Sequence, residues 1–208
     1  MAQLSETYVR GLLGAIRDAY AGIDLVSLGW VRGIGIDGGR VSVDLRAGYP
    51  LNGLRDALVA DITARLEADA LVEKAVVNLD WKVVPHAVQG DLKPLEQIRN
   101  IIAVASGKGG VGKSATAVNL ALALQADGAR VGVLDADIYG PSMPRMLGVA
   151  GAPQTVGNRI VPQQAHGLQV MSIGFMVDED TPMIWRGPMV TSALQQLLTE
   201  TNWDNLDY

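Results

Sequence analysis

The sequence predicts an α/β fold in two parts, and three observations carry this prediction. Residues 1–84 alternate between apolar stretches of helical and of strand periodicity, which predicts a small α/β domain. Residues 98–208 contain an apolar stretch, a glycine-rich turn and a helical stretch in succession, which favours a domain with a mostly parallel sheet. Residues 85–97 lie between them and carry two prolines and a glycine among polar residues, which is typical of a linker.

Within the first part, the predicted order of elements is helix, strand, strand, helix, strand. Ser5 is placed to cap a first helix, whose apolar residues recur at helical spacing as far as Tyr20 before Gly22 ends it. This part shows no catalytic constellation, so we interpret it as an interaction module. Its later elements are strands over 25–36 and 41–47 joined by a turn over 37–40, a helix over 51–66 and a strand over 74–84.

Residues 101–114 predict a short strand, a glycine-rich turn and the start of a helix. Gly107, Gly112, Lys113 and Ser114 fit the pattern G-x-x-x-x-G-K-[ST] of a phosphate-binding loop. Glycines let backbone N–H groups approach phosphate oxygens, Lys113 adds a mobile positive charge, and the Ser114 hydroxyl can ligate Mg²⁺. The predicted nucleotide-binding residues are Gly107, Lys108, Gly109, Gly110, Val111, Gly112, Lys113 and Ser114.

After this loop the sequence predicts a helix over 115–126 and a buried strand over 131–134. That strand delivers Asp135 and Asp137 at its carboxyl end, the edge where ligands bind in open α/β sheets. Beside a phosphate-binding loop, one carboxylate can hold Mg²⁺ through water and the other can orient the water that attacks the γ-phosphate. An ordinary strand-end aspartate that caps the next turn is the alternative.

The last third of the chain is less regular. Residues 137–144 are predicted to form a loop stiffened by prolines, and residues 149–168 an excursion or a region of β-turns, with short strands possible at 160–161 and 168–171. A further helix begins near Pro188. Arg186 precedes that helix and could reach phosphate, but a lone arginine is more often structural.

The chain stops where a doubly wound sheet needs another parallel strand, after the helix that begins near Pro188. A P-loop enzyme also needs a second acidic strand end, the Walker B position, and the sequence shows none after this helix. We therefore expect residues 98–208 to be the N-terminal part of a P-loop ATPase domain, truncated before Walker B.

Composition excludes several kinds of site and disfavours several partners. The 208 residues contain no cysteine, which excludes disulfides and thiolate ligation of zinc or of an iron–sulfur cluster within them. The two histidines, His86 and His166, lack partners at metal-ligand spacing. No apolar run is long enough to span a membrane, no secretory leader is evident, and the net charge is −5. We therefore expect a cytoplasmic protein that binds neither membrane nor nucleic acid.

Lys108 directly follows the first glycine, and the resulting Lys-Gly-Gly-Val-Gly-Lys-Ser resembles the deviant Walker A of the MinD, ParA and nitrogenase iron-protein class of P-loop ATPases. More narrowly, residues 106–124, 134–148, 183–198 and 203–208 resemble the Mrp/ApbC family of iron–sulfur cluster carrier ATPases. The stretches Asp-x-Asp-x-Tyr-Gly-Pro-Ser and Trp-Arg-Gly-Pro separate this family from MinD and ParA relatives. The N-terminal part resembles, more loosely, an accessory domain common in bacterial members.

This resemblance implies a homodimeric, Mg²⁺-dependent ATPase that binds ATP, holds a [4Fe–4S] cluster between subunits and passes it to apo iron–sulfur proteins. It implies that Lys108 reaches across the dimer interface to the partner's nucleotide, and that the catalytic residues are Lys108, Lys113 and Asp137. It also implies that Ser114 and Asp135 ligate Mg²⁺.

The sequence departs from the family pattern in two places. The family's Cys-x-x-Cys ligand pair is not in this sequence, and Tyr49 stands where many relatives have a cysteine before a proline. The cluster ligands would therefore lie outside this chain. Two other functions stay open: a MinD- or ParA-like positioning ATPase acting on membrane or DNA, which the acidic balance opposes, and a truncated non-enzymatic interaction protein.

Overall fold

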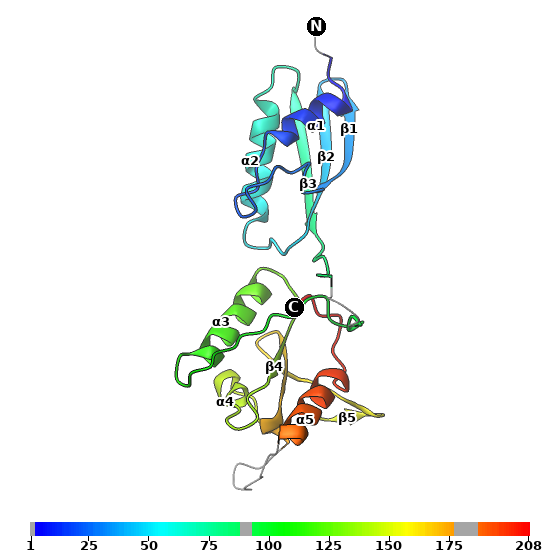
Figure 1. The fold of residues 1–208 in the computed structure, drawn as a ribbon. Coiled ribbons are helices and arrows are strands. Elements are labelled where there is room, and N and C mark those ends of the chain that lie inside the picture. Colours follow the sequence, from blue (N-terminus) through cyan, green and yellow to red (C-terminus); the bar gives the residue numbers. More distant parts are fainter. Residues whose placement is uncertain (1–2, 88–92, 177–186) are drawn as a thin grey trace. The chain divides into compact units, whose positions relative to one another are not determined.

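The computed structural model describes residues 3–87, 93–176 and 187–208. The chain divides into two compact units, Met1–Val84 and Pro85–Tyr208, and each unit has a hydrophobic core of its own. Both units combine helices with sheets, which confirms the predicted mixed α/β fold (Figure 1). Within the described ranges, no helix is both long enough and apolar enough to span a bilayer.

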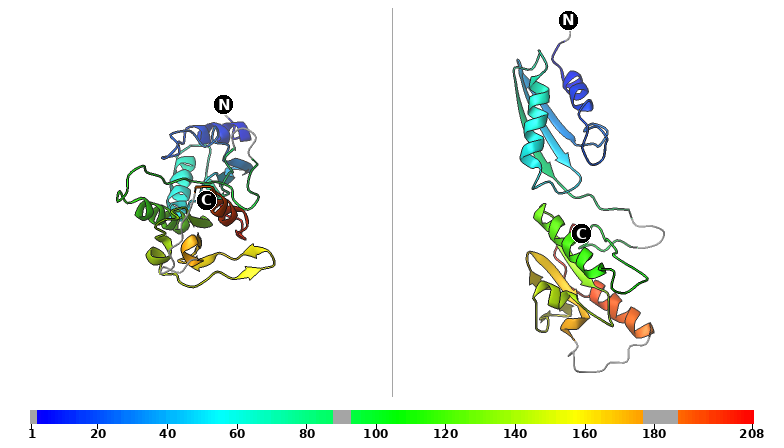
Figure 2. Two further views of the ribbon diagram at one scale, coloured as in Figure 1. Left: turned by 60° about the horizontal axis from the view of Figure 1, so that its bottom comes forward. Right: turned by 90° about the vertical axis from the view of Figure 1, so that its left-hand side faces the viewer.

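The first unit is a three-stranded sheet with two helices on one face (Figure 2). The strand order is β1-β2-β3, with β1 antiparallel and β3 parallel to β2, and the predicted element order is confirmed. Alternate side chains of β2 are buried against the helices. The elements are α1 (Glu6–Gly14), β1 (Val31–Asp37), β2 (Arg40–Ala47), α2 (Arg55–Glu67) and β3 (Lys74–Trp81).

The first helix is shorter than predicted. Ser5 caps α1 as expected, since its hydroxyl accepts a hydrogen bond from the Tyr8 N–H at 3.2 Å. The helix ends at Gly14 rather than near Gly22, so the later apolar residues belong to a loop. Ile16 lies in that loop and its side chain is buried, which explains why the apolar pattern continued past the end of the helix.

The first strand also starts later than predicted. β1 begins at Val31, and residues 25–29 form turns instead of extended chain. The Asp24 carboxylate accepts hydrogen bonds from the N–H groups of Val26 and Ser27, at 3.0 and 2.8 Å. An aspartate bonded in this way to the backbone just ahead of it favours a turn over a strand.

Tyr49 is joined to a buried carboxylate in this unit. Its hydroxyl donates to Asp18 at 2.5 Å, and the same carboxylate accepts the Ala21 N–H at 2.6 Å. Its ring packs edge-on against Trp30, with ring centroids 5.8 Å apart. Burial and the hydrogen bond to Asp18 raise the pKa of the Tyr49 hydroxyl above its usual value.

The second unit has a small sheet of order β4-β8-β7, in which β4 is parallel and β7 antiparallel to β8, and a separate hairpin of β5 and β6. Leu168 and Val170 of β8 pack in a cluster with α3, whereas Met171 packs in a cluster with α5. The elements are α3 (Lys113–Ala126), β4 (Val131–Asp135), α4 (Met143–Leu147), β5 (Thr155–Val156), β6 (Arg159–Ile160), β7 (Gln163–Ala165), β8 (Leu168–Ser172), a 3₁₀ turn (Ile173–Phe175) and α5 (Gly187–Thr199).

The predicted strand before the glycine-rich turn does not form. Residues 101–106 belong to no strand, and Ile101, Ile102 and Val104 are 64%, 50% and 36% exposed. A strand exists through ladder hydrogen bonds to a neighbour, and no described strand lies beside this segment. An apolar sequence of strand-like composition therefore lies outside the sheet.

Leu206–Tyr208 lies between two segments of the second unit that are far away in sequence. Leu206 forms an isolated parallel bridge with Ile98, and the Arg99 N–H donates to its carbonyl at 3.0 Å. On the other side, the Asp207 N–H donates to the Arg130 carbonyl at 2.8 Å. The Asp207 carboxylate forms ion pairs with Arg99 and with Arg130. These contacts tie the start of the 98–106 segment to the start of β4.

Candidate functional site

The glycine-rich turn is exposed and contains two residues whose backbone conformation favours glycine. Gly110 and Gly112 have φ angles of 74° and 87°, in the left-handed region that favours glycine. All residues from 107 to 112 are exposed, so ligands can approach their backbone. The Lys108 N–H donates to the Ser106 hydroxyl at 3.1 Å, which closes a small turn and leaves the Lys108 side chain exposed.

Lys113 and Ser114 form the first turn of α3. The residue before them, Gly112, has no side chain to cap the helix, so the first N–H groups of α3 have no side-chain acceptor at the cap position. A helix start of this kind attracts anions through its unpaired N–H groups and its dipole. The Ser114 hydroxyl accepts a hydrogen bond from the Ser142 hydroxyl at 2.8 Å.

Asp135 ends β4 and is 4% exposed. One of its carboxylate oxygens accepts the N–H groups of Ser142 at 2.8 Å and of Met143 at 3.0 Å, and the Ser172 hydroxyl lies 3.4 Å away. The other oxygen accepts the Asp137 N–H at 3.2 Å. Asp135 therefore caps the start of α4, which is the alternative role that the sequence analysis gave for a strand-end aspartate.

Asp137 lies two residues further on and is exposed. One of its carboxylate oxygens accepts the Gly140 N–H at 3.2 Å. Asp137 lines the same cavity as Lys113, Ser114 and Asp135, so the structure places these four predicted residues around one cavity. The exposed loop residues 107–112 do not line this cavity, and Arg186 lies outside the described residues.

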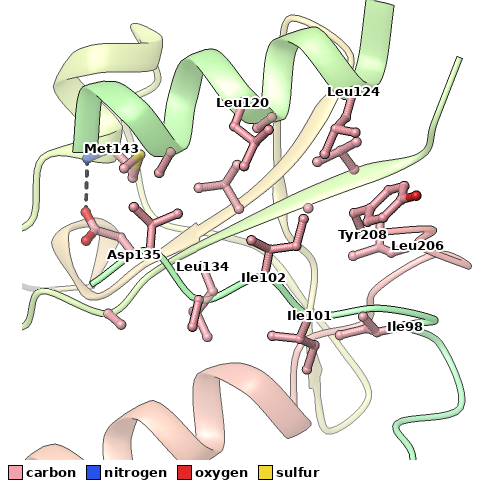
Figure 3. A pocket seen from close by; sticks show the side chains of 18 of the residues that line it. Ile98, Ile101, Ile102, Leu120, Leu124, Leu134, Asp135, Met143, Leu206 and Tyr208 are labelled. Atoms are coloured by element: carbon pink, nitrogen blue, oxygen red, sulfur yellow. Dashed lines mark hydrogen bonds between the residues drawn. The ribbon is translucent and has the colours of Figure 1, made fainter. Parts of the chain in front are cut away.

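The cavity has a volume of about 440 Å³ and separates the 101–105 segment from β4. Figure 3 shows its layout: Leu120 and Leu124 of α3 lie along one side, and Leu206 and Tyr208 lie at one end. Asp135, bonded to the Met143 N–H, lies at the other end. The Asp135 carboxylate and the Tyr208 hydroxyl thus lie at opposite ends, and most of the remaining lining is apolar.

Sequence reasoning missed α4 and with it Ser142. Residues 137–144 were predicted to be a loop, but a short helix begins at Met143. A serine followed by a proline two positions later is a helix-start pattern, and Ser142-Met143-Pro144 has it. That pattern could have located the helix. It could not have shown that the Ser142 hydroxyl points to Ser114, because this contact joins residues 28 positions apart.

The oxygen donors of three residues that line the cavity suit Mg²⁺ in chemical type. They are the Ser114 hydroxyl and the carboxylates of Asp135 and Asp137, and Mg²⁺ prefers oxygen ligands and keeps several water or phosphate oxygens. Among the described residues, no three His, Cys, Asp or Glu side chains gather into a metal site. A cation here would therefore depend on nucleotide phosphates for much of its coordination.

Comparison with known families matches both units. Residues 97–208 match the family described as ParA, NUBPL iron-transfer P-loop NTPase, and residues 6–79 match the family described as iron–sulfur cluster assembly protein. A solved structure from Archaeoglobus fulgidus, titled nucleotide-binding protein in complex with ADP, is 35% identical, covers 55% of this chain and 44% of that chain, and has a TM-score of 0.47.

Three curated relatives show the range of similarity. A protein named iron–sulfur cluster carrier protein from Synechocystis is 41% identical over 99% of this chain and 60% of its own length. A protein of the same name from Escherichia coli K12 is 60% identical over 71% of this chain and 42% of its own length. The mouse iron–sulfur cluster transfer protein NUBPL is 52% identical over 56% of this chain and 37% of its own length. This chain spans about half the length of the curated relatives that it matches.

Proposed function

The chain belongs to the NUBPL iron-transfer P-loop NTPase family, and on this premise we propose that it binds and hydrolyses ATP and takes part in carrying iron–sulfur clusters to apoproteins. One observation carries the nucleotide part of the proposal. A glycine turn with two left-handed residues leads into a helix whose Lys113 and Ser114 line one cavity together with Asp135 and Asp137. These groups are the ones that phosphoryl transfer uses.

The proposed roles follow from the chemistry of each side chain. The N–H groups of the loop and of the first turn of α3 hold the phosphates, and Lys113 balances the charge of the β- and γ-phosphates. Ser114 and Asp135 would hold Mg²⁺, and Asp137 would orient the attacking water. When bound, Mg²⁺ neutralises charge on the phosphate oxygens. Lys108 is exposed, so in a homodimer it is free to reach the nucleotide of the partner subunit.

The cluster is the cargo of the proposed function and not a resident cofactor. These 208 residues contain no cysteine, so they supply no thiolate to a [4Fe–4S] cluster. The thiolates would have to come from outside them. Two independent features support the carrier assignment: both units match families whose descriptions name iron transfer or iron–sulfur assembly. Apo iron–sulfur proteins are the proposed recipients, in the cytoplasm, with no membrane or nucleic-acid partner.

Binding of a fluorescent ATP analogue to the 208-residue chain, with and without Mg²⁺, tests the nucleotide part. We expect saturable, Mg²⁺-dependent binding that Lys113→Ala weakens by at least about tenfold, because a charged contact to phosphate is lost. Lys74→Ala, on the exposed side of β3 in the other unit, is the matched control and should leave the affinity unchanged. Absence of binding by the unaltered chain, or equal affinity of Lys113→Ala, would refute the proposal.

A further inference from the structure

We propose that Ser142 is a positioning residue for the Mg²⁺-bound nucleotide, acting through the hydroxyl of Ser114. This inference rests on the proposed ATP binding and assigns a role to a residue that sequence reasoning passed over. Ser142 is hydrogen-bonded both to Ser114, on the first turn of α3, and to Asp135, at the end of β4. Its hydroxyl lies 2.8 Å from that of Ser114, and its backbone N–H lies 2.8 Å from the Asp135 carboxylate.

The Ser142 hydroxyl does not cap the helix that follows it. Ser142 occupies the cap position before α4, where a serine side chain normally accepts a backbone N–H of its own helix. Here it forms no such cap bond, and Asp135 accepts the N–H groups of Ser142 and Met143 instead. Because the carboxylate does the capping, the Ser142 hydroxyl is left to bond to Ser114.

The backbone around Ser142 is held in place from several sides. Met143 is 4% exposed, and prolines at positions 141 and 144 restrict the chain on either side of the Ser142–Met143 pair. The 3₁₀ turn packs closely under this segment: a Cβ added at Gly174 would lie 3.1 Å from the Pro141 ring and 3.3 Å from that of Pro144. A serine fixed in this way can define the orientation of a hydroxyl that it contacts.

The contact is suited to preparing a cation ligand. A serine hydroxyl has two lone pairs and one proton, so Ser114 can accept from Ser142 and still offer a lone pair to Mg²⁺. Without Ser142, the Ser114 hydroxyl loses this partner and can rotate among its staggered side-chain conformations. Loss of the Ser142 hydroxyl should therefore weaken Mg²⁺ coordination while leaving the phosphate contacts of the loop and of Lys113 in place.

The test is the Mg²⁺ dependence of binding of a fluorescent ATP analogue to the 208-residue chain. For Ser142→Ala we expect the Mg²⁺ concentration that gives half of the Mg²⁺-induced gain in affinity to rise about three- to tenfold, the effect of one lost hydrogen bond. Affinity measured in EDTA should stay within about twofold of the unaltered chain. Ser142→Thr, which keeps the hydroxyl, should restore the Mg²⁺ dependence. Ser192→Ala, an exposed serine on α5, is the matched control.

The outcomes separate this inference from the function on which it rests. If the unaltered chain does not bind the analogue, the proposed function fails. If it binds and Ser142→Ala has the same Mg²⁺ dependence, only the role of Ser142 is refuted. An equal loss of affinity with and without Mg²⁺ would also refute it, since that result indicates a structural role. If Ser142→Ala unfolds, Ser142→Cys keeps the size of the side chain with a weaker donor and should show a smaller shift in the same direction.

Discussion

The two units differ in how they surround their apolar extended segments. In the first unit, β2 has a paired strand on both sides and helices on one face, and Val43 and Leu45 are 0% and 2% exposed. In the second, the 101–106 segment is more apolar, yet it pairs with no strand among the described residues, and Ile101 is 64% exposed. The same kind of sequence is core in one unit and the rim of a cavity in the other.

This difference shows that burial of a strand-like sequence is decided by its neighbours and not by its own composition. The first unit behaves as a closed scaffold, with its apolar side chains already in contact. The second unit keeps its glycine turn exposed, and Lys113, Ser114, Asp135 and Asp137 line an open cavity. Substitutions in the two units should therefore have different consequences, and three changes test this contrast in order of decreasing effect.

The largest effect is expected for Leu45→Ala in β2. Removing a fully buried side chain from a closed core should lower the free energy of unfolding of the first unit by about 2–5 kcal/mol. Chemical denaturation of the whole chain, followed by hydrogen exchange in residues 40–47 and 74–81, measures it. A loss below about 1 kcal/mol would mean that this core is less tightly closed than its burial indicates.

The next largest effect is expected at the hydrogen bond between Tyr49 and the buried carboxylate of Asp18. Tyr49→Phe removes the donor to Asp18 and should cost about 1–3 kcal/mol at neutral pH, because a buried acceptor loses its partner. The raised pKa of Tyr49 adds a pH signature. Its contribution is complete below the usual tyrosine pKa of about 10 and is lost as the pH rises through the higher folded-state pKa.

The stability of the unaltered chain should therefore fall more steeply above about pH 10 than that of the Tyr49→Phe variant. Urea denaturation of the first unit at a series of alkaline pH values gives both slopes. Equal slopes would show that the Tyr49 hydroxyl has the same pKa in the folded and unfolded chains. That result would contradict a buried hydrogen bond between Tyr49 and Asp18.

The smallest effect is expected for Ile101→Ala. Because most of this side chain is already exposed, its removal should change the free energy of unfolding by less than about 1 kcal/mol. Denaturation of the second unit, monitored by hydrogen exchange in β4 and β8, is the measurement. A loss as large as that of Leu45→Ala would show that Ile101 is buried in solution and would remove the contrast between the units.

Local patterns were enough to predict much of both units. The glycine turn, the start of α3 at Lys113 and the placement of Asp135 at the end of β4 all follow from signals within a few residues. The predicted turn between β1 and β2 is likewise confirmed, with Gly38 at φ 56°. Such features depend on the backbone preferences of individual residues, which are the same wherever the residue stands in the fold.

What the sequence did not predict depends on contacts between distant residues. Residues 101–106 have strand-like composition, but a strand also needs a partner, and partner positions are not written in a local pattern. Leu25 lies in a turn and its side chain is buried, so an apolar residue that belongs to a turn was interpreted as part of a strand. The contact between Ser142 and Ser114 likewise joins two segments that only the fold brings together.

The most direct test of the contrast is hydrogen exchange of the whole chain with and without ATP and Mg²⁺. If the second unit holds the nucleotide site, addition of ATP and Mg²⁺ should slow hydrogen exchange at the amides of the glycine turn and the start of α3, residues 107–116. Amides of β2 and β3 in the first unit should be unchanged. Protection confined to the first unit, or no protection of residues 107–116 at saturating ATP and Mg²⁺, would contradict the assignment of this loop as the phosphate-binding site.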